Sequence, residues 1–526
     1  MFRSQFPDET IPEVSLFDYL FAEIDEADLD RVALVDGPSG AETTYRQLIG
    51  QVLALSGALA AERIGVGDVV ALHSPNVPAF ATVFHGILRS GATATTINAL
   101  FTAEEIVKQL RDSGARMLFT VSPLLPAALD AAREVGIPDA RIIVLDGAEG
   151  FRSLRDLLTL GAPPPEVRFD PATHVAVMPY SSGTTGRPKG VMLSHRNLVA
   201  NVQQCAPVLD MAPDDRILAV LPFFHIYGMT VLLDLALQRR STLVTMPRFD
   251  LVQFLELIQN QRLTFLFIAP PIGVALAKHP LVDQYDLGSL RGLMSGAAPF
   301  DTALGEAVQA RTGARVQQGY GMSESSPVTH VIPPSRPDLP IGSIGFPIAN
   351  IECRLIDVES GEEITALDVD SGRSRSGELW VRGPNIMLGY LGDAESTAQT
   401  VDADGFLHTG DIAQIGAEGE YYIVDRLKEL IKYKGYQVPP AELEALLLTH
   451  PLISDAAVIG VPDDENGEVP KAFVVRVADA ELEEQAVIDF VAEHVAPYKK
   501  VRQVEFIDAV PKSTAGKILR KDLRVR

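Results

Sequence analysis

Short apolar runs recur through the first third of the chain, and longer amphipathic segments separate them. Almost continuous apolar runs of this length are typical of strands buried on both faces of a sheet. Such runs lie at 69–72, 117–121 and 142–145, and a further strand is expected around 93–97. Strands that alternate with helices indicate a parallel sheet that is covered on both faces.

Two of the segments between these strands have helical patterns. Apolar residues three or four positions apart follow Asn76, a residue type that often caps the first turn of a helix. Residues 102–105 read TAEE, the form of a capping box, in which two side chains satisfy the first free backbone amides. We therefore expect one helix that begins after Asn76 and another that runs from 102 to Arg111.

The alternation resumes after three consecutive prolines at 163–165, and the character of the chain then changes twice. From about 341 to 389, short β-rich runs are split by Gly, Asp and Ser, which predicts a small antiparallel barrel or meander. Beyond residue 425, an apolar helix at 440–448 and two later strands fit an α+β unit.

The pattern as a whole predicts an α/β protein with a large N-terminal domain at 1–425 and an α+β C-terminal domain at 429–526. Within the large domain we expect two α/β subdomains with parallel sheets, at about 1–170 and 171–340, and a small β-barrel subdomain at about 341–425.

Charge and composition narrow the classes of partner. The 526 residues include 45 Lys and Arg against 69 Asp and Glu, a net charge of −24. This charge argues against nucleic acid or an anionic membrane as a general partner. No run approaches the roughly 20 apolar residues that span a bilayer. An anionic substrate would need positive charge placed locally against this field, and the sequence indicates no particular protein partner.

The cysteine content indicates the compartment. Cys205 and Cys353 are the only cysteines, which excludes a disulfide framework and favours a reducing cytosol. Neither has His or Cys neighbours at metal-ligand spacing, so both are expected to be small buried residues. The ends of the chain show no secretory or peroxisomal signal, and we expect a cytoplasmic protein.

The strand expected from 175 leads into residues 182–190, which read SGTTGRPKG. Glycines let the backbone approach an anion closely, and free amides, hydroxyls and a lysine supply donors to phosphate oxygens. The segment differs from a Walker loop because Pro188-Lys189-Gly190 replaces the Gly-Lys-Ser/Thr ending. The pattern favours a polyphosphate site over a plain polar turn.

Four later segments also carry candidate chemistry. They are 320–324 (YGMSE), 409–411 (TGD), 425–435 (DRLKELIKYKG) and 511–520 (PKSTAGKILR). Glu324 is a hard oxygen ligand suited to Mg²⁺, and a carboxylate such as Asp411 can accept both hydroxyls of a ribose. Each segment also has a plainer explanation: a turn that buries Tyr320, a cap, a solvated basic face and a disordered tail.

Taken in this order, the five segments resemble the acyl-adenylate-forming superfamily of acyl- and aryl-CoA synthetases, luciferases and peptide-synthetase adenylation domains. The resemblance runs from about Ser15 to Arg520. Residues 222–228 (PFFHIYG), 295–299 (SGAAP) and 430–438 (LIKYKGYQV) look like the 4-coumarate:CoA ligase branch. Fatty acyl-CoA ligases share much of the same pattern.

The resemblance implies two half-reactions that use ATP, Mg²⁺ and coenzyme A. A substrate carboxylate first attacks the α-phosphate of ATP and releases pyrophosphate. Lys517 would bridge the carboxylate and the α-phosphate, and His225 resembles the family's aromatic gate to the acid site. The nucleotide would contact Ser181, Ser182, Gly183, Thr184, Thr185, Lys189, Gln318, Gly319, Tyr320, Ser323, Asp411 and Arg426, and Mg²⁺ would contact Glu324 and Thr185.

In the second half-reaction the thiol of coenzyme A attacks the acyl-adenylate. The family rotates its mobile C-terminal domain for this step, about a hinge that maps here to 426–428 with Lys428 as pivot. Coenzyme A would contact Arg248, Lys434 and Gly435. The acid would contact Tyr227, Val231, Met294, Ala297, Gly319, Gly321, Pro327, Val328 and Lys432.

Several functions share these parts. A hydroxycinnamate is the first choice of acid, because Tyr227 can stack on a ring and the glycines leave room for one. A medium- or long-chain fatty acid is the second choice. An adenylation enzyme that loads a carrier protein, a luciferase-like oxygenase and a non-enzymatic nucleotide-binding module remain further alternatives.

Overall fold

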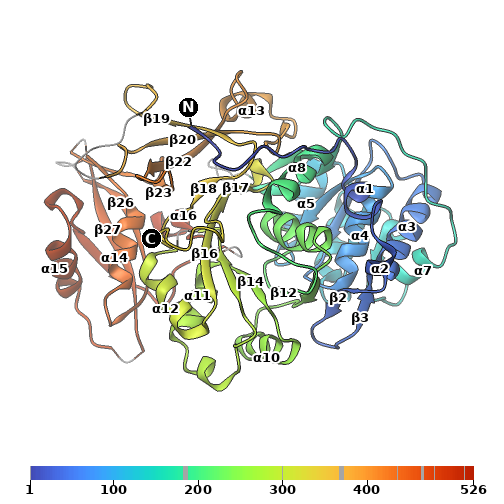
Figure 1. The fold of residues 1–526 in the computed structure, drawn as a ribbon, viewed down its shortest axis with the longest axis horizontal. Coiled ribbons are helices and arrows are strands. Elements are labelled where there is room, and N and C mark those ends of the chain that lie inside the picture. The colour runs from blue at the N-terminus through green and yellow to red at the C-terminus, as the bar shows by residue number, and fades with distance from the viewer. Residues whose placement is uncertain are drawn as a thin grey trace.

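The computed structural model describes residues 2–181, 188–298, 300–365, 372–434, 436–463, 467–478, 480–513 and 516–525. Their strands form four sheets, two large and mostly parallel and two smaller. Figure 1 shows the two large sheets side by side, the antiparallel sheet above them, and the last part of the chain as a separate layer at the left.

The first large sheet has the order β10-β11-β9-β5-β4-β6-β7-β8, and β21 pairs with β11. It is parallel from β9 to β8, as the alternating pattern predicts, and its β11 edge is antiparallel. Its strands are β4 (Val69–His73), β5 (Thr93–Ile97), β6 (Met117–Thr120), β7 (Ile142–Val144), β8 (Arg152–Ser153), β9 (Val175–Val177), β10 (Tyr180–Ser181), β11 (Lys189–Ser194) and β21 (Gly389–Tyr390).

The second large sheet has the order β18-β17-β16-β15-β14-β12-β13-β2-β3. Its central strands are parallel, and both edges are antiparallel. The strands are β2 (Val32–Asp36), β3 (Glu42–Thr44), β12 (Arg216–Ala219), β13 (Thr242–Thr245), β14 (Phe265–Ile268), β15 (Gly292–Ser295), β16 (Arg315–Gly321), β17 (Val328–Val331) and β18 (Phe346–Pro347). Because β2 and β3 come from the first 45 residues, this sheet joins distant parts of the sequence.

Helices pack around these two sheets, as expected for parallel strands that are buried on both faces. An eight-residue π-helix, η3 (Tyr227–Asp234), precedes α9. The helices are α1 (Leu16–Phe21), α2 (Glu26–Leu29), α3 (Tyr45–Ala61), α4 (Pro78–Arg89), α5 (Ala103–Ser113), α6 (Leu125–Glu134), α7 (Leu154–Leu158), α8 (His195–Cys205), α9 (Leu235–Gln238), α10 (Leu251–Gln261), α11 (Pro270–Lys278), α12 (Thr302–Thr312) and α13 (Ala394–Thr400).

A five-stranded antiparallel sheet occupies the region where the sequence predicts short β-rich runs. Its order is β1-β19-β20-β22-β23, and the N-terminal β1 pairs with β19 through Phe2 and Cys353. The strands are β1 (Phe2–Arg3), β19 (Glu352–Ile356), β20 (Gly377–Arg382), β22 (Leu407–Ile415) and β23 (Tyr421–Arg426).

The last part of the chain forms the expected α+β unit. Its sheet has the order β25-β24-β27-β26, with β28 parallel to β27, and its buried side chains form a core of their own. The elements are β24 (Ile431–Tyr433), β25 (Tyr436–Val438), α14 (Pro440–Leu448), β26 (Ile453–Asp463), β27 (Gly467–Arg476), α15 (Glu484–His494), β28 (Gln503–Phe506) and α16 (Arg520–Arg524).

Of the two helix starts predicted from the sequence, one is confirmed and one is wrong. The capping box is confirmed, because the Thr102 side chain accepts from the backbone of Glu105, and the Glu105 side chain accepts from the backbone of Thr102. The expectation that Asn76 caps the preceding helix is wrong, since Val77 is the N-cap. The buried amide of Asn76 instead donates to the carbonyls of Ala219, at the end of β12, and Leu221, and it accepts from the N–H of Phe223. These long-range bonds take the side chain away from the helix end.

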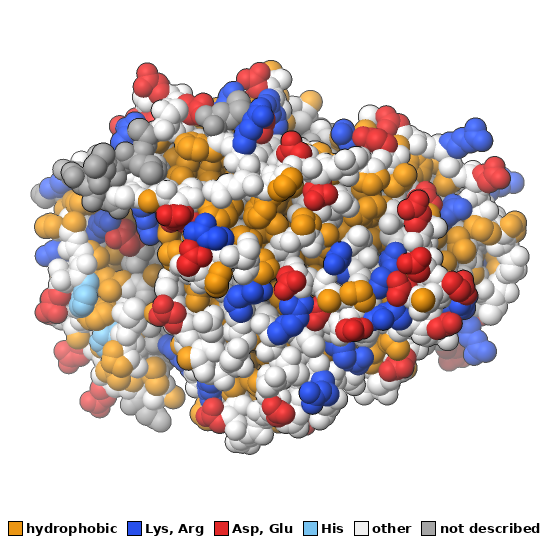
Figure 2. All heavy atoms as spheres, in the orientation of Figure 1, with side chains coloured by type: hydrophobic (Ala, Val, Ile, Leu, Met, Phe, Trp, Pro, Cys, Tyr) orange, Lys and Arg blue, Asp and Glu red, His pale blue; other side chains and the backbone are white. Residues whose placement is uncertain are grey.

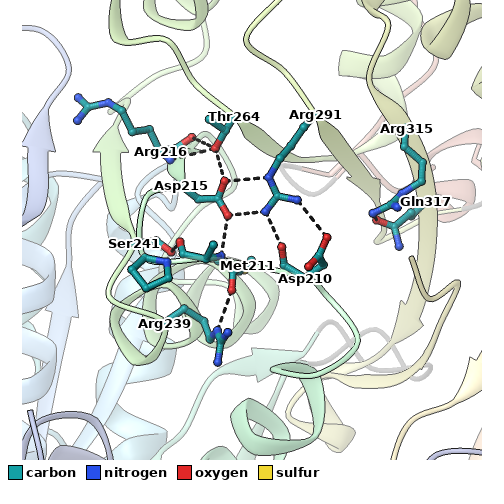
Figure 3. A network of polar contacts seen from close by, with 12 residues as sticks. Asp210, Met211, Asp215, Arg216, Arg239, Ser241, Thr264, Arg291, Arg315 and Gln317 are labelled. Carbon is teal, nitrogen blue, oxygen red and sulfur yellow. Dashed lines mark hydrogen bonds and ion pairs between the residues drawn. The ribbon is translucent and has the colours of Figure 1, made fainter. Parts of the chain in front are cut away.

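A buried carboxylate ties together the N-terminal ends of three parallel strands (Figure 3). Asp215, Thr264 and Arg291 each directly precede a strand, namely β12, β14 and β15. Asp215 Oδ1 accepts from Thr264 Oγ1 at 2.7 Å and from Arg291 Nε at 3.0 Å. Burial opposes the charge of Asp215, but these donors hold its pKa below the usual value. This network stabilises the sheet at the edge opposite its carboxyl ends.

Both cysteines lie inside the fold, and the face shown in Figure 2 mixes side chains of both charges. Cys205 and Cys353 are free and buried, as predicted. On the face shown in Figure 2, Lys and Arg side chains lie among acidic ones and form no single basic patch. No helix in the described ranges combines the length and hydropathy that crossing a bilayer needs.

Candidate active site

A small cavity of about 50 Å³ lies beyond the carboxyl ends of β15 and β16, where ligands of open α/β sheets bind. The first residues of η3 close one side, and the tail of the chain contributes one side chain. The cavity is lined by His225, Ile226, Tyr227, Met294, Gly296, Ala297, Gly319, Tyr320, Gly321, Met322, Ser323, Pro327, Val328 and Lys517.

The walls leave no room for larger side chains at two glycines. A Cβ at Gly319 would lie 2.1 Å from Cε of Met294, and one at Gly296 would lie 2.9 Å from the ring of Tyr227. The Tyr227 ring meets Phe267 edge to face at 6.3 Å, and its hydroxyl donates to the Met294 carbonyl at 3.4 Å. The wall is therefore an aromatic and thioether surface that suits an apolar or aryl group.

Lys517 reaches the cavity from a short hairpin near the C-terminus. The backbone of Ser513 donates to the carbonyl of Lys517 at 2.8 Å, and Lys512 pairs with Ile518. Gly516 adopts a left-handed φ of 79°, and a Cβ there would lie 3.2 Å from the ring of Pro271 at the start of α11. The hairpin thus docks against the large domain, and the tail is not a free end.

The charge of Lys517 affects the protonation of His225. Burial lowers the pKa of His225 to about 4, and the charge of Lys517 adds to this shift. The Nδ1 atom of His225 accepts from the backbone N–H of Tyr227 at 3.3 Å. A neutral ring with an accepting Nδ1 carries its proton on Nε2, so His225 is a hydrogen-bond donor at neutral pH.

The charges around Lys517 come from three separate segments. Burial lowers the pKa of Lys517, the charge of Arg426 lowers it further, and Asp411 and Glu324 oppose that shift. The tail lysine therefore lies within electrostatic range of both candidate nucleotide carboxylates. A cation held near these carboxylates can offset negative charge on an anion that binds in the site.

Asp411 is held between an aromatic hydroxyl and a guanidinium. The Tyr320 hydroxyl donates to Asp411 Oδ2 at 2.6 Å, and Arg426 Nε lies 3.1 Å from Asp411 Oδ1. Asp411 and Arg426 are direct partners across β22 and β23. Burial, followed by the charge of Asp411, raises the pKa of Tyr320 well above its ordinary value. These contacts fix the orientation of the Asp411 carboxylate, whose oxygens can accept from hydroxyl donors.

The candidate phosphate loop is described only at its two ends. Ser181 and Lys189 face each other across β10 and β11. Lys189 Nζ donates to Ser396 Oγ at 2.5 Å and lies 3.4 Å from Asp393 Oδ2. The expected phosphate ligands Ser182, Gly183, Thr184 and Thr185 fall outside the described residues.

Glu324 is buried beside the stem of this loop. Its Oε1 accepts from Ser181 Oγ at 3.1 Å and from the Tyr390 hydroxyl at 2.9 Å. In the described part of the chain no cluster of three or more His, Cys, Asp or Glu side chains could hold a metal alone. One oriented carboxylate fits Mg²⁺ that takes its other ligands from nucleotide phosphates and water.

Other predicted residues lie elsewhere. The Gln318 side chain accepts from Phe300 N and donates to the carbonyls of Ile341 and Ser343, so its visible role is structural. Val231 is buried within η3 and does not line the cavity. Gly435 lies outside the described residues. The remaining predicted residues are exposed and do not line the cavity, namely Arg248, Lys428, Lys432 and Lys434.

Sequence reasoning missed three features of the site. Tyr390 contacts Glu324 although 66 residues separate them, and nothing local marks it. Met322 was passed over as part of the motif around Tyr320, yet it lines the cavity. Ala297 adopts a φ of 72°, a region that residues other than glycine rarely occupy, and the apolar run around it gave no signal of this.

Two known protein families together match most of the chain. Residues 21–391 match the family described as AMP-binding enzyme, and residues 442–517 match the AMP-binding enzyme C-terminal domain. The chain is 42% identical to "4-coumarate--CoA ligase 3" of Oryza sativa subsp. japonica over 539 residues, all of this chain and 95% of that protein. It is also 42% identical to "4-coumarate--CoA ligase 1" of Petroselinum crispum, covering all of this chain and 96% of that protein.

Solved structures of similar fold span the whole chain. ATP-bound MatB from Rhodopseudomonas palustris superposes with a TM-score of 0.88 at 29% identity, covering 98% of this chain and 99% of that one. The anthranilate CoA ligase AuaEII in complex with anthranoyl-AMP also gives a TM-score of 0.88, at 27% identity and with 98% and 97% of the two chains covered.

Proposed function

The chain belongs to the family of AMP-binding enzymes, and on this basis we propose that it is an ATP-dependent, AMP-forming carboxylic acid:CoA ligase. The preferred acids are 4-coumarate and cinnamate-type aryl acids. The observation that carries the proposal is the position of Lys517, between an aromatic cavity and the carboxylates Asp411 and Glu324. The 42% identity to 4-coumarate--CoA ligases over the full chain supports the same chemistry.

The first half-reaction joins two anions. The substrate carboxylate oxygen attacks the α-phosphate, the new C–O–P linkage forms, and pyrophosphate leaves. Lys517 offsets the negative charge that builds between them, and Nε2–H of His225 donates to the carboxylate. Asp411 accepts the ribose hydroxyls, and Tyr320 and Arg426 keep it oriented. Mg²⁺, when bound with ATP beside Glu324 and the loop residue Thr185, supplies positive charge for the departing phosphates.

The second half-reaction forms the thioester. The sulfur of coenzyme A attacks the acyl carbon, a C–S bond forms, AMP leaves and the thiol proton is released. Lys517 fills part of the cavity wall in the present orientation, so the C-terminal domain has to move for the thiol to enter. We place the pivot at Lys428, within a hinge at 426–428, and the coenzyme A contacts at Arg248, Lys434 and Gly435. Hinges at the ends of elements can absorb such rotations.

The choice of acid rests on the cavity wall. Tyr227, Met294, Gly319 and Val328 contribute aromatic and apolar groups to the wall, and such groups can pack against a planar ring. An alkyl chain could pack on the same wall, so a fatty acid is the outcome against which this proposal is tested. We also propose the cytoplasm as the compartment, because both free cysteines suit a reducing environment.

A panel of acids tests the proposal. Pyrophosphate release and then AMP-forming thioester synthesis are measured with 4-coumarate, cinnamate, benzoate and octanoate. We expect the two phenylpropenoic acids to give the highest kcat/KM, and CoA to be required for turnover. Preference for octanoate would overturn the aryl assignment. Adenylate formation without any thioester product when CoA is added would favour transfer to a carrier protein, and light emission with a luciferin would favour an oxygenase.

The role of Lys517 is tested by half-reaction. Lys517→Ala removes one charged donor from the transition state and should slow adenylate formation about 100-fold or more. The same variant should convert chemically prepared acyl-adenylate to thioester at close to the normal rate. Lys521→Ala, which removes an exposed lysine of α16, is the matched control. Equal loss of both half-reactions in Lys517→Ala would contradict the assignment.

A further inference from the structure

Four residues beside the cavity are linked in a ring by one strand pairing and three side-chain contacts. Ser181 and Lys189 are direct strand partners. Ser181 donates to Glu324 Oε1 at 3.1 Å, and Tyr390 donates to the same oxygen at 2.9 Å. The ring closes because the Lys189 ammonium lies 4.8 Å from the centre of the Tyr390 ring. Tyr390 thus contacts both the candidate metal carboxylate and the loop lysine through its side chain, whereas Ser181 meets Lys189 only by strand pairing.

The position of Tyr390 is strongly determined. It lies in β21, where it pairs with Val191 of β11, and its side chain is 8% exposed. Its backbone N–H donates to Thr397 Oγ1 at 2.9 Å. Its neighbour Gly389 has a φ of 142°, and a Cβ there would lie 2.7 Å from the Thr397 side chain. The phenol ring therefore has a fixed origin from which to reach Glu324.

Tyr390 keeps two opposite charges apart. Its hydroxyl occupies Oε1 of Glu324, and its ring face attracts the Lys189 ammonium through a cation–π contact. Lys189 also has its own carboxylate, Asp393 Oδ2 at 3.4 Å. Without the aromatic ring between them, Lys189 and Glu324 could pair directly, and that ion pair would compete with a metal for the carboxylate. Among the described residues, both donors to the Glu324 side chain reach Oε1, so Oε2 is the oxygen that could bind a cation.

We infer that Tyr390 is a positioning residue for the nucleotide's metal: its hydroxyl orients the carboxylate of Glu324, and its ring holds Lys189 away from that carboxylate. The inference rests on the proposed function, because that function requires ATP with a divalent cation. Partners that orient a metal ligand typically change metal affinity or activity by about 10- to 100-fold when they are removed.

The test compares two tyrosines in similar settings. Tyr390→Phe removes only the hydroxyl. The matched control is Tyr422→Phe, because Tyr422 is 9% exposed, donates to Glu420 Oε1 at 2.9 Å and lies under the guanidinium of Arg373. Tyr422 does not line the cavity. Binding of Mn²⁺–ATP is followed by electron paramagnetic resonance and calorimetry, and binding of ATP is measured separately in the presence of a chelator.

We expect Tyr390→Phe to weaken Mn²⁺–ATP binding about tenfold. It should leave metal-free ATP binding and the KM for the acid within about twofold of the wild-type values, because these depend on other side chains. The Mg²⁺ concentration for half-maximal pyrophosphate release should rise in parallel. Tyr422→Phe should change none of these. Equal effects of the two variants, or equal weakening of ATP with and without metal, would overturn the inference.

If Tyr390→Phe does not fold, a second variant tests the same inference. Thr397→Val removes the hydroxyl that fixes the backbone of Tyr390 and is expected to weaken Mn²⁺–ATP binding in the same direction. An unchanged affinity in folded Thr397→Val would then count against the inference. The experiments distinguish a wrong function from a wrong role for Tyr390. If the wild-type protein binds Mn²⁺–ATP but activates no acid, only the proposed function is contradicted.

Discussion

The carboxylate of Asp425 accepts a hydrogen bond from the backbone N–H of Ala441 at 2.8 Å. Asp425 lies in β23 and Ala441 lies in the first turn of α14, so the bond supplies a partner for a free amide at a helix start. The candidate pivot Lys428 separates the two residues in the sequence. A rotation about Lys428 would carry Ala441 away from Asp425, and the bond therefore belongs to the orientation in which Lys517 reaches the cavity.

Removing this bond should bias the enzyme against its first half-reaction. Asp425→Ala loses a cap contact worth about 1 kcal/mol, which corresponds to roughly a fivefold shift between orientations. We expect adenylate formation to slow by about that factor, and thioester formation from prepared adenylate to be unchanged or faster. Single-turnover rates of the two half-reactions measure this. Slower thioester formation with normal adenylation would be the opposite result and would remove Asp425 from this role.

The pivot itself is tested by a change of backbone freedom. No hydrogen bond between described residues uses the N–H of Lys428, so proline can replace it without breaking one in the present orientation. Proline fixes φ, and we expect Lys428→Pro to slow thioester formation about tenfold or more while adenylation stays within about threefold. Lys428→Ala, which keeps φ free, is the control. A larger loss in adenylation than in thioester formation would exclude Lys428 as the pivot.

The shape of the acid site depends on Gly319 and Met294. A methyl group at position 319 would lie 2.1 Å from Cε of Met294 and 3.3 Å from the carbonyl of His330. The flexible methionine has to move into the cavity, so Gly319→Ala should raise the KM for cinnamate about tenfold and the KM for benzoate less. The double variant with Met294→Ala should recover much of the loss. If that second change fails to help, the clash is not the cause.

The pKa of His225 makes a prediction about pH. Burial and the charge of Lys517 lower this pKa from 6.5 to about 4. Because the folded value lies below the unfolded one, the neutral ring stabilises the fold above about pH 6.5, and this contribution is lost as the pH falls towards 4. The neutral donor is therefore present throughout the working range. We therefore expect kcat for pyrophosphate release to show no inflection near pH 6.5 that is due to His225. An inflection near pH 6.5 that is present in the wild type and absent in His225→Asn would place the pKa of His225 at its ordinary value and contradict the prediction.

Several elements were predictable because their signals are local. The parallel strands β4, β6 and β7 follow from continuous apolar runs, and the capping box at Thr102 follows from two residues three positions apart. The ordered motifs also sufficed to identify the family that the comparisons report. Each of these inferences uses periodicity or spacing within a short stretch, which the backbone geometry of a helix, strand or turn fixes by itself.

The tertiary structure decided which distant residues meet. Asn76 does not cap the helix, because the end of β12 and the residues that follow it provide three backbone partners for its amide. Tertiary packing also brings Tyr390 to Glu324 and Lys517 to His225. These contacts arise when separately formed sheets and the C-terminal unit pack together, so no local pattern specifies them. The sequence alone determined the elements and the chemical groups, and packing determined the site in which those groups converge, because buried polar groups take whichever partners the assembled core provides.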